Sequence, residues 1–184
     1  TFVTMVCGFG SIPEGWDVSG DSEIHNATSI SLRIVHKGRS VLLTGDAVGR
    51  HLNSPEDALL ATEKYMVDQK HVIPIASDVL VASHHGANNG SAKTFIQAVN
   101  PKFVIFSAGD EHEHPRQATV DRIRAALTDQ PKMFRTDLGD KKRPGEWDEG
   151  SEPTDKDEPG DDDVDVLIDK DGKLTVKYHD PANN

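Results

Sequence analysis

Cysteine is almost absent from this chain: Cys7 is the only one among 184 residues. A single cysteine excludes an intrachain disulfide framework and any metal site built from several cysteines, so a metal would need histidine and carboxylate ligands. No apolar run approaches the ~20 residues of a membrane span, and no basic-then-apolar leader opens the chain. We therefore expect a soluble chain, with the cytoplasm slightly favoured over export, while a removed leader or an attached membrane part stays open.

Basic residues are also scarce, with 20 Lys and Arg against 31 Asp and Glu and a net charge of −11. No segment combines clustered Lys and Arg with aromatic residues, the pattern of nucleic-acid-binding surfaces, so nucleic-acid binding is disfavoured but stays open. Much of the negative charge belongs to residues 146–165, which are rich in Asp, Glu, Pro and Gly. Such a tract cannot bury apolar surface and predicts a mobile loop.

Apolar runs alternate with helix-start signals along the rest of the chain. The helix starts are indicated by Ser54 and Ser91 as N-caps and by Pro55 and Pro115 at first helical positions. This alternation predicts an α/β domain with a mixed sheet and flanking helices. The expected strands are 1–10, 28–38, 39–46, 77–83, 101–109, 132–137 and a hairpin across an Asp-Gly turn at 171–172, and the expected helices are 54–67, 91–99 and 115–127.

Polar residues able to bind metals follow three of these strands. Asp46 ends "LLTGD", His84 and His85 follow "SDVLVAS", and His114 ends "EHEHP", where His112 lies two positions earlier. Each residue alone is more simply a turn or surface residue. Together at the carboxyl ends of neighbouring strands, they are the residue types of a zinc or manganese hydrolytic centre.

Three segments in this order carry a family resemblance: "HNATSISLRIVHKGRSVLLTGD", "SDVLVASHHGANNGSAKTFIQAVNPKFVIFSAG" and "HPRQATVDRIRAAL". Over about residues 1–140 the chain resembles the C-terminal half of the metallo-β-lactamase fold, and within it the competence-type (ComEC-like) branch of hydrolases and DNA-uptake proteins. The resemblance implies an αββα sandwich that binds two zinc ions, with manganese as an alternative, and a bridging hydroxide.

The resemblance also implies roles for individual residues. Asp46 would be the metal-bridging carboxylate and His114 the final metal ligand. His84 or His85 would protonate the leaving group or bind a phosphoryl oxygen, although one of the pair could be a ligand instead. His25 or Asn26 occupies the place of a further site residue, and His25 is taken as a metal ligand.

The main ligand motif of that family, His-x-His-x-Asp-His, has no counterpart in this sequence. Since the chain also begins with Thr1, we expect either a fragment whose other half carries those ligands or a natural degenerate homologue. A half of the fold should expose apolar surface and need a partner, either the N-terminal half or another chain. We predict a half-domain at 1–140, an acidic flexible loop at 141–163 and a C-terminal hairpin of the same domain at 164–184.

The sequence leaves two candidate functions open. One is a metal-dependent hydrolase acting on a phosphoester or related bond, completed by the missing half. The other is a non-catalytic partner or relic module of the same fold. Nucleic-acid processing ranks below a small-molecule or phosphoester substrate because of the acidic charge.

Overall fold

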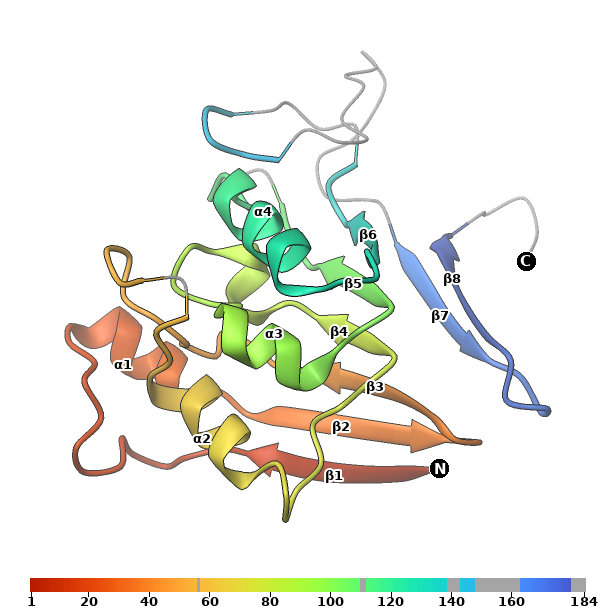
Figure 1. Ribbon diagram of the computed structural model, residues 1–184, viewed down its shortest axis with the longest axis horizontal. Helices are drawn as coiled ribbons and strands as arrows, with labels where there is room; N and C mark the ends of the chain where they lie inside the picture. Colours follow the sequence, from red (N-terminus) through yellow and green to blue (C-terminus); the bar gives the residue numbers. More distant parts are fainter. Residues whose placement is uncertain (56, 110–111, 139–142, 148–162, 180–184) are drawn as a thin grey trace.

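A mixed six-stranded sheet organises the chain, as the computed structural model shows (Figure 1). The structure describes all residues except 56, 110–111, 139–142, 148–162 and 180–184. The first three strands are antiparallel neighbours, whereas the third to the sixth run parallel. The carboxyl ends of the parallel strands therefore lie together at one end of the sheet, here called its carboxyl end. In spatial order the strands are β1 (Phe2–Cys7), β2 (Ser31–His36), β3 (Arg39–Leu43), β4 (Val79–Val81), β5 (Phe103–Phe106) and β6 (Lys132–Arg135).

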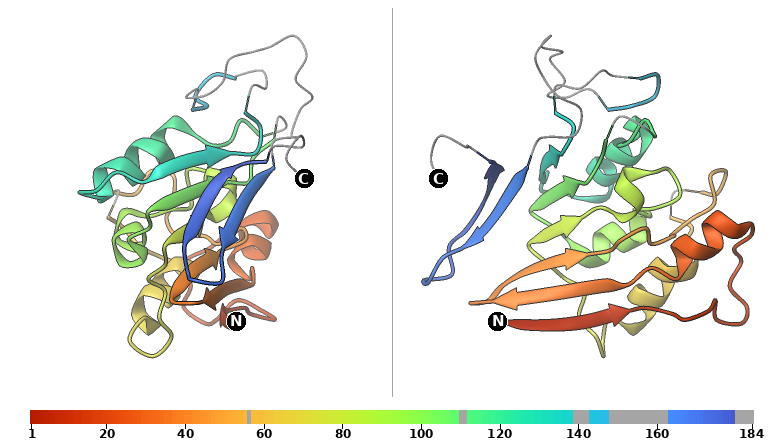
Figure 2. Two further views of the ribbon diagram at one scale, coloured as in Figure 1. Left: turned by 90° about the vertical axis from the view of Figure 1, so that its right-hand side faces the viewer. Right: turned by 180° about the vertical axis from the view of Figure 1, so that it is seen from behind.

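Both faces of the sheet are covered, by helices on one side and by a hairpin on the other (Figure 2). The central strands are continuous apolar runs because successive side chains point into opposite layers. Leu80 belongs to the helix-side core and the adjacent Val79 to the hairpin-side core. The covering elements are α2 (Ala61–Gln69), α3 (Lys93–Val99) and α4 (Gln117–Ala126) on one side and β7 (Val164–Ile168) with β8 (Leu174–Tyr178) on the other.

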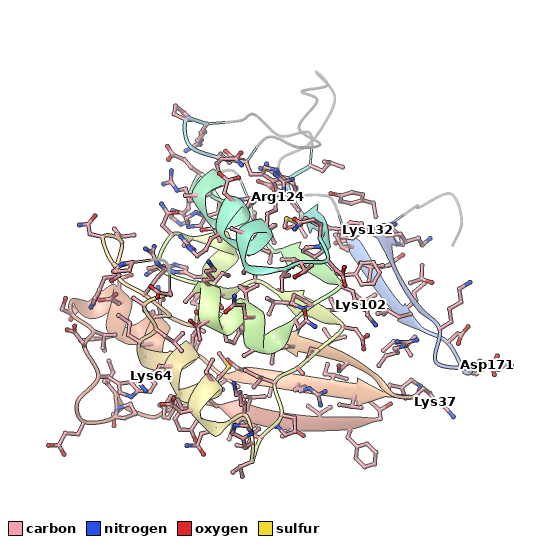
Figure 3. All side chains as sticks on the ribbon, viewed as in Figure 1. Lys37, Lys64, Lys102, Arg124, Lys132 and Asp171 are labelled. Carbon is pink, nitrogen blue, oxygen red and sulfur yellow. The ribbon has the colours of Figure 1, made fainter. Side chains whose placement is uncertain are left out.

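The hairpin β7–β8 forms across the Asp-Gly turn that the sequence predicted, with Gly172 at φ 82°. Its apolar side chains pack on the sheet, which ties this C-terminal segment to the same body. The tip of the hairpin lies beside the β2–β3 turn, where Figure 3 labels Asp171 and Lys37, and Arg39 donates to the carbonyl of Gly172. Most of the expected acidic loop, 141–163, lies outside the described residues.

Strand β1 is the outermost strand of the sheet and pairs only with β2 among the described residues. Its side chains are apolar but largely uncovered: Phe2 is 77% exposed, Val3 62% and Met5 60%. Within the described ranges, no helix combines the length and apolar character needed to cross a bilayer.

The three predicted helix starts were wrong, and α4 begins at Gln117, with Arg116 at its N-cap, rather than at Pro115. Helix α2 begins at Ala61 rather than near Ser54, because Leu60 N donates to Gly49 and Ala61 takes a positive φ of 48° that interrupts any helix running into it. Helix α3 begins at Lys93 without a side-chain cap, because Ala92 occupies the N-cap position and Ser91 lies one residue before it.

A short helix, α1 (Asp21–Ala27), was not predicted. In the chain it follows β1 and precedes β2, and it lies at the carboxyl end of the sheet (Figure 1). Its last turn brings Asn26 to the loop that follows β4.

Candidate functional site

Three loops meet at the carboxyl end of the sheet, and backbone hydrogen bonds join them. His84 N in the loop after β4 donates to Gly45 O in the loop after β3, at 2.9 Å. Arg116 N, after β5, donates to Gly86 O at 3.1 Å. The structure thus brings Asp46, His84, His85 and His114, which the sequence had singled out, to one place.

The backbone of the histidine loop is strained. His84 and His85 have φ values of 50° and 57°, in the left-handed region that side-chain-bearing residues seldom adopt. Each such residue costs about 1–3 kcal/mol and persists only where its surroundings impose it. Gly86 follows at φ 86°, and a Cβ there would lie 2.6 Å from Pro115 and 2.7 Å from Phe106. The glycine is therefore required for the His84–Gly86 turn to reach the His114–Pro115 loop.

His85 is bound at both ring nitrogens. Its Nδ1 bonds the backbone carbonyl of Ser107, and because a carbonyl oxygen only accepts, Nδ1 carries the proton. Its Nε2 lies 3.1 Å from Asp46 Oδ1. This distance allows an ion pair when the His85 ring is protonated. Both side chains are about two-fifths exposed, at 44% and 40%, so a substrate can reach the pair.

His84 has a different environment from its neighbour. The amide Nδ2 of Asn26 donates to His84 Nε2 at 3.3 Å, so Nε2 is an acceptor. The proton then lies on Nδ1, which donates to Asn89 Oδ1 at 2.8 Å. With both nitrogens engaged by side-chain amides, the His84 ring is held in place. Of the two histidines that the sequence could not separate, His85 is the one that presents a reactive nitrogen.

His114 completes a cluster of three imidazole rings. Its ring centroid lies 5.9 Å from that of His84 and 6.5 Å from that of His85. Burial, with a smaller contribution from the nearby positive charge of Arg116, lowers the pKa of His114 to about 4. The ring is thus neutral near pH 7, and its buried Nδ1 has no hydrogen-bond partner among the described residues.

The two remaining histidine predictions lie at the margin of this cluster. His112 is exposed, 6.2 Å from His114 between ring centroids. His25 is exposed at the end of α1, and its backbone carbonyl accepts bonds from Thr28. It is the adjacent Asn26 that reaches the histidine loop, so of the two residues that the sequence offered here, the structure joins Asn26 to the site.

Asn26, Asn89 and the Ser107 carbonyl fix the tautomers of the two histidines, and sequence reasoning named only the first of them. The run of Asn88, Asn89 and Gly90 after the histidines indicates a loop and gives no sign of a contact back to His84. No side-chain pattern can report the Ser107 interaction, because a backbone carbonyl makes it.

The donors at this end suit zinc, which takes imidazole nitrogen and carboxylate oxygen, and no described residue hydrogen-bonds the Nδ1 of His114. Within the described part of the chain, however, no three His, Cys, Asp or Glu residues are arranged to hold one metal ion. Asp46 faces His85 at 3.1 Å, and both ring nitrogens of His84 are engaged by amides. These residues fit part of a coordination shell and do not make a complete one.

Two curated proteins resemble this chain. It is 34% identical over 115 residues to "Competence protein ComA" of Neisseria gonorrhoeae and 30% identical over 118 residues to "ComE operon protein 3" of Bacillus subtilis. The matches cover 61% and 60% of this chain but only 14% and 13% of those proteins. No family model matches the sequence. The chain is therefore similar to competence proteins over about three fifths of its length and spans a small part of theirs.

Proposed function

We propose that this chain carries part of the active site of a metal-dependent hydrolase that cleaves a phosphoester or related bond. The observation that supports it most is the Asp46–His85 pair, exposed at the carboxyl end of the sheet and held at His85 Nδ1 by a backbone carbonyl. An imidazole oriented by a carbonyl and polarised by a carboxylate is suited to proton transfer.

In this proposal His85 gives its Nε2 proton to the leaving-group oxygen, or donates it to a phosphoryl oxygen, while Asp46 stabilises the charged ring. Such proton transfer contributes about 10²–10⁴-fold to rate. His84 keeps the turn in place, with its ring fixed by Asn26 and Asn89. His114 stays neutral near pH 7 because burial disfavours its charged form.

Zinc is the metal that we propose, with manganese as the alternative. Asp46 and His114 would be ligands from this chain, and His25 stays a candidate ligand. Because no three donors converge within the described residues, the other ligands would come from outside them. A bound metal would supply a hydroxide near neutral pH.

We further propose that a partner segment or chain covers β1 and completes an αββα sandwich of the metallo-β-lactamase type. The uncovered Phe2, Val3 and Met5 support a partner there, because exposed apolar side chains on an edge strand favour burial. The two relatives are several times longer than the matched region, which leaves room for such a segment in proteins of this kind.

The test uses the full-length gene product that contains these residues. Metal content is measured by mass spectrometry, and hydrolysis of bis(p-nitrophenyl) phosphate is followed in the wild type and in Asp46→Ala and His114→Ala. We expect bound zinc or manganese in the wild type and loss of activity in both variants. Activity unchanged by both substitutions would overturn the proposal.

The absence of three converging donors in the described part of the chain favours a second candidate, a non-catalytic partner module. This candidate predicts that the 184-residue chain retains no stoichiometric metal after extensive dialysis. It also predicts no hydrolysis by the full-length product.

A further inference from the structure

A buried carboxylate lies beneath the histidine loop, outside the site described above. Glu63, on α2, is completely buried. Its Oε1 accepts a bond from Ser91 N at 2.6 Å and its Oε2 one from Ala92 N at 2.8 Å. One side chain thus binds two consecutive amides at the end of the loop 83–92, which presents His84, His85 and Asn89.

Gly49 supports the same loop and leaves space for the carboxylate. A Cβ at Gly49 would lie 1.8 Å from Glu63 Oε2, so no side chain larger than hydrogen fits beside it. The amides of Gly49 and Arg50 both donate to Asn89 O, at 2.9 and 3.0 Å. Asn89 is the residue that bonds His84 Nδ1, so these contacts act directly on the orientation of that ring.

Two buried arginines bind the carbonyl groups of the loop. Arg122 on α4 donates to Gly90 O at 3.0 Å, and Arg50 donates to Asn88 O at 2.9 Å. The loop is therefore held by a carboxylate at its amide groups and by guanidinium groups at its carbonyls. The charge of Arg122 also favours the ionised form of Glu63.

Burial of the Glu63 carboxylate is unfavourable for the free energy of folding, so stability alone does not explain it. Burial raises the pKa of Glu63 to about 7, so the charged form is strongly disfavoured at this position. Replacing buried charged groups by well-packed apolar residues is often neutral or stabilising. What an apolar residue could not do is accept two backbone N–H bonds and fix the loop that holds His84 and His85 at positive φ.

We infer that Glu63 is a positioning residue for the histidine loop: it fixes the ring orientations of His84 and His85 by binding the amides of Ser91 and Ala92. The inference rests on the proposed function only for what the loop then does in the reaction.

The test is the ring ¹⁵N spectrum of histidine-labelled chain, which reports the tautomer and hydrogen bonding of each imidazole. Glu63→Gln keeps the shape of the side chain but places an NH₂ donor against one of the two amides. We expect the His84 and His85 ring signals to move while those of His36 and His71, far from the loop, stay. Coincident His84 and His85 signals in folded wild type and Glu63→Gln would overturn the inference.

A milder variant covers the case in which Glu63→Gln does not fold. Glu63→Asp keeps the carboxylate but shortens the side chain by one methylene group, so the carboxylate moves away from the amides of Ser91 and Ala92. The His84 and His85 signals should move in this variant as well. Unmoved signals in folded Glu63→Asp would contradict the positioning role.

Activity adds a separate readout in the full-length gene product. Glu63→Gln should lower kcat about 10–100-fold with little change in KM, as misplacement of a reacting group does. If the wild type hydrolyses nothing, the proposed function fails, but the ring spectra still decide whether Glu63 positions the loop.

Discussion

The two ends of the sheet differ in how completely their charged and polar side chains are paired. At the amino end, Asp78 precedes β4 and is fully engaged: Ser40 N donates to it at 3.1 Å and Lys102 Nζ at 2.9 Å, and Arg39 lies 3.5 Å away. Burial raises the pKa of Asp78, but the Lys102 and Ser40 hydrogen bonds outweigh it, and the pKa falls below its usual value. These contacts stabilise the charged group and tie three strands together.

At the carboxyl end, the corresponding groups are strained or incompletely paired. Two consecutive histidines have positive φ, His114 has a buried nitrogen without a partner among the described residues, and Asp46 faces a histidine in reach of solvent. Strain and unsatisfied polar groups are retained in proteins mainly where they serve a function. We therefore assign a stabilising role to the amino end and the reacting groups to the carboxyl end.

The largest expected effect is on catalysis. His85→Gln in the full-length gene product should lower the rate of phosphodiester hydrolysis by about 10²–10⁴-fold, because the proton donor is lost. His71→Gln, at an exposed histidine away from the site, is the control and should leave the rate unchanged. Equal rates for His85→Gln and the control would show that His85 takes no part in the reaction.

The second prediction concerns the turn that brings the loops together. Gly86→Ala should lower the free energy of unfolding by about 2–4 kcal/mol, since it combines a positive φ with overpacking against Pro115 and Phe106. Gly10→Ala, where nothing lies near the added methyl group, should change it little. Urea unfolding of both variants measures the difference, and similar midpoints would refute the close approach.

The third prediction concerns Glu63, beneath the histidine loop, and the pH dependence of the free energy of unfolding. The pKa of Glu63 is raised from 4.5 to about 7 on folding, mainly by burial, so its stabilising contribution is complete below pH 4.5 and is lost as the pH rises through 7. Relative to Glu63→Gln, the wild type should lose about 3 kcal/mol of stability over this range. Urea unfolding of both proteins from pH 4.5 to 8 measures it, and a constant difference would contradict the raised pKa.

The smallest effect belongs to the amino end and has the opposite sign. Because the pKa of Asp78 is lowered on folding, its contribution is present above its unfolded value of 3.8 and disappears as the pH falls below it. Asp78→Asn should therefore destabilise the chain by about 1–2 kcal/mol at pH 7 and by less at pH 3. An unfolding free energy that is equally reduced at both pH values would contradict this account.

The sequence was sufficient to predict the sheet, because the central strands are buried on both faces and read as continuous apolar runs. It also predicted that Asp46, His84, His85 and His114 would meet, since they follow neighbouring strands. The features that the sequence could not predict depend on tertiary contacts. Ser91 does not cap α3, because the helix begins one residue later and Ala92 occupies the N-cap position. The difference between His84 and His85 depends on Asn26, 58 residues away in sequence, and on a backbone carbonyl.

The most direct measurement compares the same substitution at the two ends of the sheet. Asp46→Asn and Asp78→Asn are made in the full-length gene product, and the hydrolysis rate of bis(p-nitrophenyl) phosphate is determined per folded molecule. We expect Asp46→Asn to lose at least about 100-fold, because His85 loses its carboxylate, while Asp78→Asn keeps the wild-type rate. A wild-type rate for Asp46→Asn, or an equal loss for both variants, would contradict the assignment of the chemistry to the carboxyl end.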